Sequence, residues 1–207
     1  MMISDEPTYS AHIEPLEAEA LRDVEDIIDI SKQASGYIPT SLRIMAYKPN
    51  ILRAFSGLIG AIMRTESDLS QDLKWLAAHA VSTAAGCRYC QAHTASNSSK
   101  SGLPIKKIHE LLLYETSDAF DPSDRALVAF CLAAGETPNS VNEDHFRKLH
   151  EFFNKGQIVE IVSVISLFGW LNRWNDTFAS DLEEAPLKFA NRHLTERGWV
   201  AGKHAKK

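Results

Sequence analysis

The sequence predicts an all-α protein, on three observations. Apolar residues recur at spacings of three and four along most of the 207-residue chain, which is the period of an amphipathic helix. Glycine, proline and N-cap residue types stand where these periodic segments begin or end. No segment carries a convincing strand pattern. The length suits one sizeable domain, and we expect a single domain over residues 1–207.

The first periodic segment, residues 14–36, predicts a helix that follows a loosely ordered tail at residues 1–13. The positions that share one face are Leu16, Ala20, Val24, Ile27, Ile28 and Ser31. Gly36 lies just past the end, where glycine commonly terminates a helix. A short helix over residues 40–47 is expected to stop at Pro49.

The next helix is expected to begin after Asn50, a residue type favoured at the N-cap. Its apolar stripe consists of Leu52, Phe55, Leu58, Ile59, Ile62 and Met63. Residues 67–86 predict another helix, in which Asp68 and Gln71 have the spacing of a capping box and Gly86 is the stop. The helix after it carries two cysteines and ends at Gly102.

Pro104 and Pro122 stand where a first helical position is expected, the latter directly behind Asp121. Residues 141–154 are amphipathic. The segment from Gln157 to Phe178 contains "IVEIVSVIS", which is β-branched enough to suggest a strand. Its apolar residues nevertheless pair at a helical period, so we predict a buried helix there.

Composition narrows the classes of function. The net charge of −5 and the scattered basic residues argue against a nucleic-acid partner. No run of about eighteen apolar residues occurs, so a membrane span is not expected. The first residues, "MMISDEPTYSAHIEPLEAE", carry neither a basic region nor an apolar core, so a signal peptide is not expected either. We therefore expect a cytoplasmic protein, and in that compartment a close cysteine pair more often signals metal or redox chemistry than a structural disulfide.

Two short segments, "CRYC" at residues 87–90 and "NRWN" at residues 172–175, share an arginine followed by an aromatic residue at an offset of 85. We call this pair of segments the internal echo. We interpret it as a degenerate helical repeat, with one half over residues 36–102 and the other over residues 120–180. Coincidence between two short matches is the alternative.

The cysteine motif "AGCRYCQAHTAS" places three reactive side chains on one helix. Gly86 ends the preceding helix, so Cys87 falls near the start of the next one and Cys90 lies one turn later on the same side. The backbone N–H groups and the helix dipole at that first turn favour a thiolate. His93 borders Cys90 and is expected to act as base or as a stabilising imidazolium. Such a pair can attack a peroxide and then close to a disulfide.

Two alternatives compete with redox chemistry. Cys87, Cys90, His93 and His79 supply the ligand types of a zinc site, although structural zinc sites usually draw their second ligand pair from a distant segment. Packing as two small apolar side chains is the other alternative. His79 taken alone is typical of a core or cleft histidine. Cys131, in "VAFCLAAG", lies on an apolar face and is expected to be an inert core thiol.

The motif and its flanks resemble the alkylhydroperoxidase D-like, peroxidase-related branch of the carboxymuconolactone decarboxylase superfamily. The similar segments are "GYIPTSLRIMAYKPNILRAF", "LAAHAVSTAA", "GCRYCQAHTAS", "GQIVEIVSVISLFGWLNRWNDT" and "GWVAGKH". The resemblance implies a homo-oligomeric helical bundle that reduces hydroperoxides without a cofactor. It also implies that Cys90 is peroxidatic, that Cys87 resolves the sulfenic acid, and that a dithiol or thioredoxin-like protein is the reductant.

Two positions depart from the family pattern. The family histidine usually stands four residues after the second cysteine, where this chain has Thr94, with His93 one place earlier. The family also carries a proton-relay glutamate twelve residues before the first cysteine, where this chain has Trp75. We hypothesise that Glu160, which stands twelve residues before Asn172 in the echo, fills the relay position. A structural ion pair or water-bridged glutamate is the alternative.

The leading expectation is therefore a thiol-dependent peroxidase that uses Cys90, Cys87 and His93. A protein disulfide reductase is one alternative, and a non-catalytic oligomerisation or metal-binding module with a vestigial cysteine pair is the other. The helix expected over residues 157–178 is apolar on more than one face, with Phe168, Trp170 and Trp174 close together. Part of it is expected to lie in a subunit interface, with burial by its own chain as the alternative.

Overall fold

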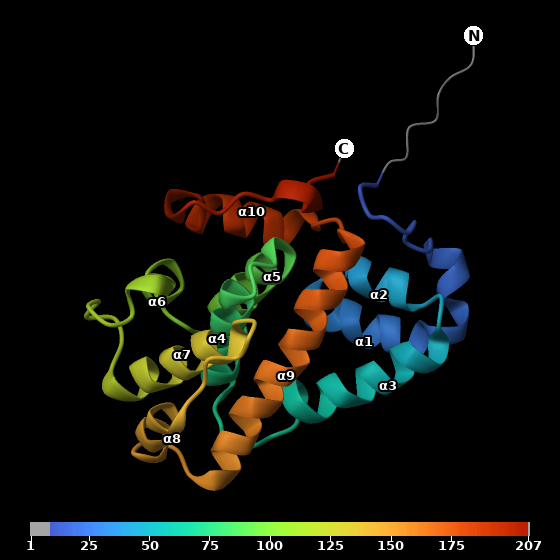
Figure 1. The fold of residues 1–207 in the computed structure, drawn as a ribbon. Helices are drawn as coiled ribbons and strands as arrows, with labels where there is room; N and C mark the ends of the chain where they lie inside the picture. Colours follow the sequence, from blue (N-terminus) through green and yellow to red (C-terminus); the bar gives the residue numbers. More distant parts are fainter. Residues whose placement is uncertain (1–8, 207) are drawn as a thin grey trace.

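A computed structural model describes residues 9–206, which fold into helices and connecting loops without a β-strand, so the predicted all-α class is confirmed (Figure 1). The α-helices are α1 Glu25–Ser35, α2 Thr40–Met45, α3 Pro49–Ile59, α4 Gln71–Ala84, α5 Arg88–Lys100, α6 Ile105–His109, α7 Pro122–Gly135, α8 Glu143–His150, α9 Lys155–Phe178 and α10 Glu184–His193. Short helical turns are η1 Ala18–Val24, η2 Gly60–Arg64, η3 Leu111–Leu113, η4 Thr195–Arg197 and η5 Gly202–His204.

Helix α9 forms the centre of the molecule and packs on both α4 and α5 (Figure 1). The blue-to-cyan helices α1–α3 lie on one side of it and α6–α8 on the other, while α10 crosses over α5. The helix predicted from Gln157 to Phe178 is thus confirmed, starting two residues earlier. The β-branched residues Ile158, Ile161, Val164 and Ile165 are buried against neighbouring helices, which overrides their preference for strands. Val159, Val162 and Trp170 of the same helix are exposed, so it is buried on part of its surface and not all round.

Three helices begin with a reciprocal cap between the N-cap residue and the third helical residue. These pairs are Asp121 with Asp124 at α7, Asn142 with His145 at α8, and Asn154 with Gln157 at α9. Each pair satisfies backbone N–H groups that have no partner inside the helix. Pro122 takes the first helical position behind Asp121, as predicted.

Several predicted boundaries are wrong for local reasons. Residues 14–36 form two elements, because the chain winds as a 3₁₀ helix up to Val24 before α1 begins. Helix α3 starts at Pro49 behind Lys48, since a proline at the first helical position loses no hydrogen bond. The capping box expected between Asp68 and Gln71 does not form: Ser70 is the N-cap of α4.

The predicted N-terminal tail lies partly outside the described residues, which begin at Tyr9. In its described part, the Ser10 N–H donates to both carboxylate oxygens of Asp181, and the His12 N–H donates to the Phe178 carbonyl at 2.8 Å. These bonds join the start of the described chain to the end of α9. Within residues 9–206, no helix combines the length and apolar character needed to cross a membrane.

Candidate functional site

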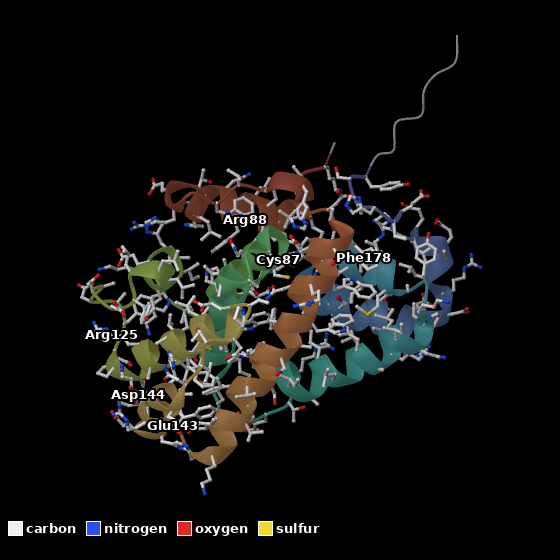
Figure 2. The ribbon with its side chains drawn as sticks, in the orientation of Figure 1. Cys87, Arg88, Arg125, Glu143, Asp144 and Phe178 are labelled. Atoms are coloured by element: carbon white, nitrogen blue, oxygen red, sulfur yellow. The ribbon has the colours of Figure 1, made fainter. Side chains whose placement is uncertain are left out.

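The two cysteines lie where α4 gives way to α5. Gly86 breaks the chain between the helices with a φ of 72°, a left-handed conformation that glycine adopts without strain. Cys87 is then the N-cap of α5, and its Sγ accepts a hydrogen bond from the Cys90 N–H at 3.4 Å. Both are free thiols with exposures of only 1% and 3%. Figure 2 shows Cys87 between the start of α5 and the last turns of α9.

The surroundings push the pKa values of the two thiols apart. The pKa of Cys87 is lowered, chiefly by a hydrogen bond from the Cys90 thiol and further by the N–H groups of the first turn of α5. The pKa of Cys90 is raised well above its ordinary value, first by burial and then by the same hydrogen bond. Cys87 is therefore the more acidic of the two thiols.

A cavity of about 310 Å³ reaches Cys90 between α1–α3 and the core helices. Its wall is largely aromatic and aliphatic, and includes Tyr37, Phe55, Trp75, Tyr89, Phe168 and Leu171. Cys90, His93 and Asn175 bring polar atoms to it. Among the described residues that line this cavity, Cys90 contributes sulfur and Cys87 does not. A small apolar molecule would therefore meet Cys90 first.

His93 lines the cavity, but its hydrogen bonds go to Glu183 and Tyr37 and not to Cys90, the partner expected from the sequence. Its Nε2 is 2.6 Å from Oε2 of Glu183, and its Nδ1 is 3.2 Å from the hydroxyl of Tyr37. The ring stacks on Tyr89 with a centroid distance of 4.2 Å. Both ring nitrogens of His93 thus have partners other than the Cys90 thiol.

Glu183 is a site residue that the sequence analysis missed. It precedes α10, and its Oε1 accepts hydrogen bonds from the Tyr89 hydroxyl at 3.0 Å and the Thr40 N–H at 2.5 Å. Burial raises the pKa of this carboxyl, but the charge and hydrogen bond of His93 and the Thr40 N–H outweigh it, so the pKa lies below its usual value. Only the tertiary fold brings Glu183 to His93, ninety positions apart.

The two departures from the family pattern have clear structural consequences. The Thr94 hydroxyl donates to the Cys90 carbonyl at 2.7 Å and lies 3.0 Å from Nδ1 of His79. His79 is a core histidine, and burial lowers its pKa to about 4. Trp75 forms part of the cavity wall, edge-on to Phe168.

Glu160 does not fill the relay position. Its Oε2 accepts a hydrogen bond from the Leu69 N–H at 2.9 Å, in the loop before α4. It is absent from the described lining of the cavity at Cys90. The structural alternative for Glu160 therefore holds, and the relay hypothesis is wrong.

The two echo motifs differ in local structure but touch. Residues 87–90 open a helix after a break, whereas residues 172–175 lie within the continuous helix α9. The amide Nδ2 of Asn175 donates to Sγ of Cys90 at 3.6 Å. This bond stabilises negative charge on Cys90 and lowers its pKa, against the larger effect of burial.

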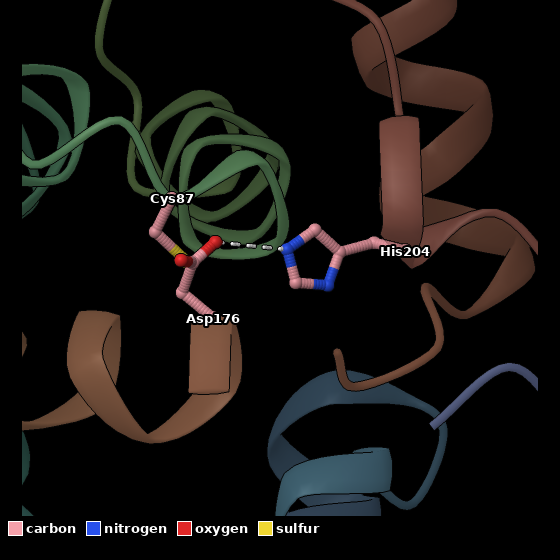
Figure 3. Close-up of side chains that lie close together, drawn as sticks. All are labelled: Cys87, Asp176 and His204. Atoms are coloured by element: carbon pink, nitrogen blue, oxygen red, sulfur yellow. Dashed lines mark ion pairs between the residues drawn. The ribbon is translucent and has the colours of Figure 1, made fainter. Parts of the chain in front are cut away.

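The zinc set considered from the sequence is not assembled. His79 bonds to Thr94 and His93 to Tyr37 and Glu183, so neither ring turns a free nitrogen to the cysteines. Cys87 instead lies beside Asp176 and His204 (Figure 3). Cys131 is fully buried on α7 and its pKa is raised by burial, as expected of an inert core thiol.

Comparisons with known proteins agree with this fold. The model of the carboxymuconolactone decarboxylase family matches residues 49–133, from the start of α3 into α7. No curated protein sequence matches the chain significantly.

Solved structures match over most of the chain. A cysteine-to-alanine variant of the debrominase Bmp8 in complex with 2,3,4-tribromopyrrole is 27% identical, covers 88% of this chain and 98% of its own, and has a TM-score of 0.81. The apo form of Bmp8 is 29% identical over 86% of this chain and 95% of its own, with a TM-score of 0.79. A peroxidase-related protein with an alkylhydroperoxidase AhpD core from Ralstonia eutropha JMP134 is 21% identical over 98% of this chain and 100% of its own, with a TM-score of 0.76.

The family match and the debrominase relatives indicate an enzyme. Residues 49–133 match the carboxymuconolactone decarboxylase family, and the helical fold of the chain as a whole is similar to that of an AhpD core.

Proposed function

We propose that this enzyme is a thiol-dependent reductase, and in the first place a peroxidase, in which Cys90 and Cys87 cycle between dithiol and disulfide. The observation that carries the proposal is the apolar cavity that ends at Cys90, whose sulfur is backed by the low-pKa thiol of Cys87. A buried thiol pair of unequal acidity has the nucleophile and the resolving sulfur that a reductive cycle needs.

Access and acidity assign complementary roles to the two sulfurs. Cys90 is the sulfur at the cavity, so it attacks the substrate, the role that the family resemblance also implies. Cys87 favours the thiolate form and receives a hydrogen bond from the Cys90 thiol, so it is the nearest base for the Cys90 proton. Once that proton has moved, the Asn175 amide stabilises the Cys90 thiolate.

The peroxidase cycle balances with these two thiols. The Cys90 sulfur bonds to the terminal oxygen of the hydroperoxide, the O–O bond breaks, and the alkoxide takes up a proton and leaves as an alcohol. The Cys87 sulfur then attacks the Cys90 sulfenic acid, and hydroxide takes up a proton and leaves as water. One hydroperoxide thus becomes alcohol and water while two thiols become one disulfide. A small dithiol or thioredoxin-like protein reduces the disulfide, and we propose the cytoplasm, which supplies such reductants, as the compartment.

The chain of Tyr37, His93 and Glu183 supplies the proton for the leaving oxygen. Burial raises the pKa of Tyr37, so its hydroxyl stays protonated near neutral pH. The Glu183 carboxylate can only accept, so Nε2–H of His93 donates to it, while Nδ1 of His93 pairs with the Tyr37 hydroxyl. Tyr37 and His93 both line the cavity, where they can reach the leaving oxygen. Glu183 provides the carboxylate that is missing at Trp75, although it comes from the N-cap of α10.

Reductive dehalogenation of an aromatic ring is the second candidate. The debrominase Bmp8 has a TM-score of 0.81 to this chain and its variant binds 2,3,4-tribromopyrrole. The cavity beside Cys90 has aromatic walls from Trp75, Tyr89 and Phe168, and these suit a flat apolar ring. The stoichiometry also fits: C–Br becomes C–H, bromide leaves, and two thiols become one disulfide.

Turnover assays on the cysteine variants test both candidates. The reduced protein is assayed with dithiothreitol and either tert-butyl hydroperoxide or 2,3,4-tribromopyrrole. We expect hydroperoxide consumption by wild type and by the matched control Cys131→Ser, and loss of it in Cys90→Ser and Cys87→Ser.

A sulfenic acid probe separates the two roles, since it should label Cys87→Ser and leave Cys90→Ser unlabelled. Turnover of the bromopyrrole alone would select the second candidate. Full activity with either substrate in Cys90→Ser would contradict the proposed site.

A further inference from the structure

We propose that Cys87, Asp176 and His204 form a binding site for a zinc-like divalent cation, on the side of Cys87 that faces away from the cavity. The three side chains come from the N-cap of α5, the end of α9 and η5. Their donor atoms all lie within 4.8 Å of one another (Figure 3). Sulfur, imidazole nitrogen and carboxylate oxygen are the three ligand types that zinc takes in proteins.

His204 presents an unpartnered nitrogen to this cluster. Its side chain is fully buried, and Nδ1 lies 2.8 Å from the carbonyl oxygen of Ser180. A carbonyl can only accept, so Nδ1 carries the proton and the neutral ring turns the lone pair of Nε2 inward. Nε2 has no hydrogen-bond partner and lies 3.6 Å from Oδ1 of Asp176.

The cluster therefore brings three electron-pair donors together. Lys203 contacts Oδ2 of Asp176, whereas Nε2 of His204 faces Oδ1, the other carboxylate oxygen. A metal ion between the three donor atoms would give Nε2 of His204 the partner that it lacks. Zinc binds cysteine as the thiolate, so binding at Cys87 would release the thiol proton.

The spacing of Asp176 and His204 fits a tetrahedral ion. Zinc bonds of about 2.0–2.3 Å place neighbouring ligands roughly 3.3–3.7 Å apart. The 3.6 Å between Asp176 and His204 falls in that range, and Cys87 Sγ lies within 4.8 Å of both donor atoms. Outer partners hold both ligands in place: Ser180 binds the far nitrogen of His204, and Lys203 binds the other carboxylate oxygen of Asp176 at 2.9 Å. Asp176 is half-exposed, which gives the ion a route from solvent.

The site shares one atom with the redox pair proposed above. A Cys87 sulfur bonded to Cys90 is no longer an anionic thiolate ligand, so the dithiol binds the ion and the disulfide releases it. The ion in turn occupies the sulfur that must resolve a sulfenic acid at Cys90. This competition rests on the proposed function, whereas the metal site itself needs only the reduced protein.

Zinc titration of the reduced, metal-free full chain tests the site, with a chromophoric chelator as competitor. We expect one zinc ion per chain, and at least tenfold weaker binding for Asp176→Asn and for His204→Gln. Asp144→Asn and His145→Gln, surface changes of the same kind on α8, are the matched controls and should bind like wild type. Because Asp176 is half-exposed, its substitution keeps the test valid if His204→Gln fails to fold.

Cobalt(II) adds a spectroscopic readout that does not depend on activity. A thiolate-to-cobalt charge-transfer band should appear in wild type and vanish in Cys87→Ser. Equal zinc affinity in wild type, Asp176→Asn and His204→Gln would overturn the site and leave the cysteines alone as ligands. Disulfide formation in a chain without zinc affinity would also overturn it, leaving the proposed function intact. Zinc binding in a chain that forms no disulfide would support the site and reject the redox function.

Discussion

At the scale of single residues, the acidity of Cys87 depends on its neighbour. The hydrogen bond from the Cys90 thiol is the largest cause of its lowered pKa. Cys90→Ala, made in a Cys131→Ser background, should therefore raise the pKa of Cys87. Thiolate absorbance in the near ultraviolet, followed against pH, measures this change. An unchanged pKa would mean that the backbone N–H groups of α5 set the acidity alone.

The buried side chain of His79 should make the unfolding free energy of the protein depend on pH. Its folded pKa of about 4 lies below the unfolded value of 6.5, so between these pH values the unfolded chain binds more protons. Its contribution is thus complete above about pH 6.5 and is lost as pH falls to about 4, by an amount on the order of 3 kcal/mol. His79→Gln, which keeps a polar partner for Thr94, should show a smaller fall in unfolding free energy from pH 7 to pH 5 than wild type. Parallel pH profiles would contradict this account of His79.

Substitution of Glu183 tests the proposed proton-donating chain of Tyr37, His93 and Glu183. Glu183→Gln keeps the size of the side chain and removes the charge that holds His93, so turnover should fall by about tenfold or more. Glu184→Gln, one position on and fully exposed, should leave turnover unchanged. Because neither variant touches the sulfurs, chemical formation of the disulfide by diamide should proceed in both. Equal turnover of Glu183→Gln and wild type would remove this chain from the mechanism.

At the scale of elements, the join between α4 and α5 fixes the geometry of the cysteine pair. Gly86 has φ 72°, and a Cβ at that position meets no atom within 4 Å, so alanine would act through backbone strain alone. Gly86→Ala should destabilise the protein by about 1 kcal/mol and shift the N-cap at Cys87. Gly57→Ala, in the last turn of α3 with equally open space, should stabilise by about 0.5–1 kcal/mol. Denaturant unfolding measures both, and equal effects of the two changes would contradict the role of Gly86.

A comparison of the helices with the sequence shows which features of the fold can be predicted from sequence alone. Helix existence, the glycine stops at Gly36 and Gly86, and the cap at Asp121 depend on local chemistry and were predictable. The capping box at Asp68 did not form because α4 begins later, behind Ser70, in a loop where distant Glu160 of α9 binds the Leu69 N–H. The cysteine motif could be placed at a helix start, but Glu183, Asp176 and His204 reach the motif only through folding. Pairings between residues this far apart in the sequence leave no periodic signal.

At the scale of the whole molecule, an apolar groove between α3 and α9 bears on the expected homo-oligomer. Leu58 and Val159 line it with exposures of 51% and 65%, and Ile51, Phe146 and Trp170 extend the apolar surface. We propose that a second copy of the chain covers this groove; the family resemblance implies a homo-oligomer, and the exposed apolar side chains suggest this surface for the interface.

Charge placed in the groove should separate the copies. Leu58→Glu or Val159→Glu should lower the mass measured by sedimentation equilibrium toward that of a monomer. Leu112→Glu alters an equally exposed leucine outside the groove and should not change the mass. A wild-type mass of one chain would contradict the proposed assembly.

The most direct test of the central claim is disulfide mapping after the reduced protein meets one equivalent of tert-butyl hydroperoxide. Alkylation and peptide mass spectrometry then report the state of every cysteine. The account predicts the loss of two thiols, a disulfide between Cys87 and Cys90, and an untouched Cys131. Three free thiols after the peroxide, or oxidation at Cys131 in place of the pair, would contradict it.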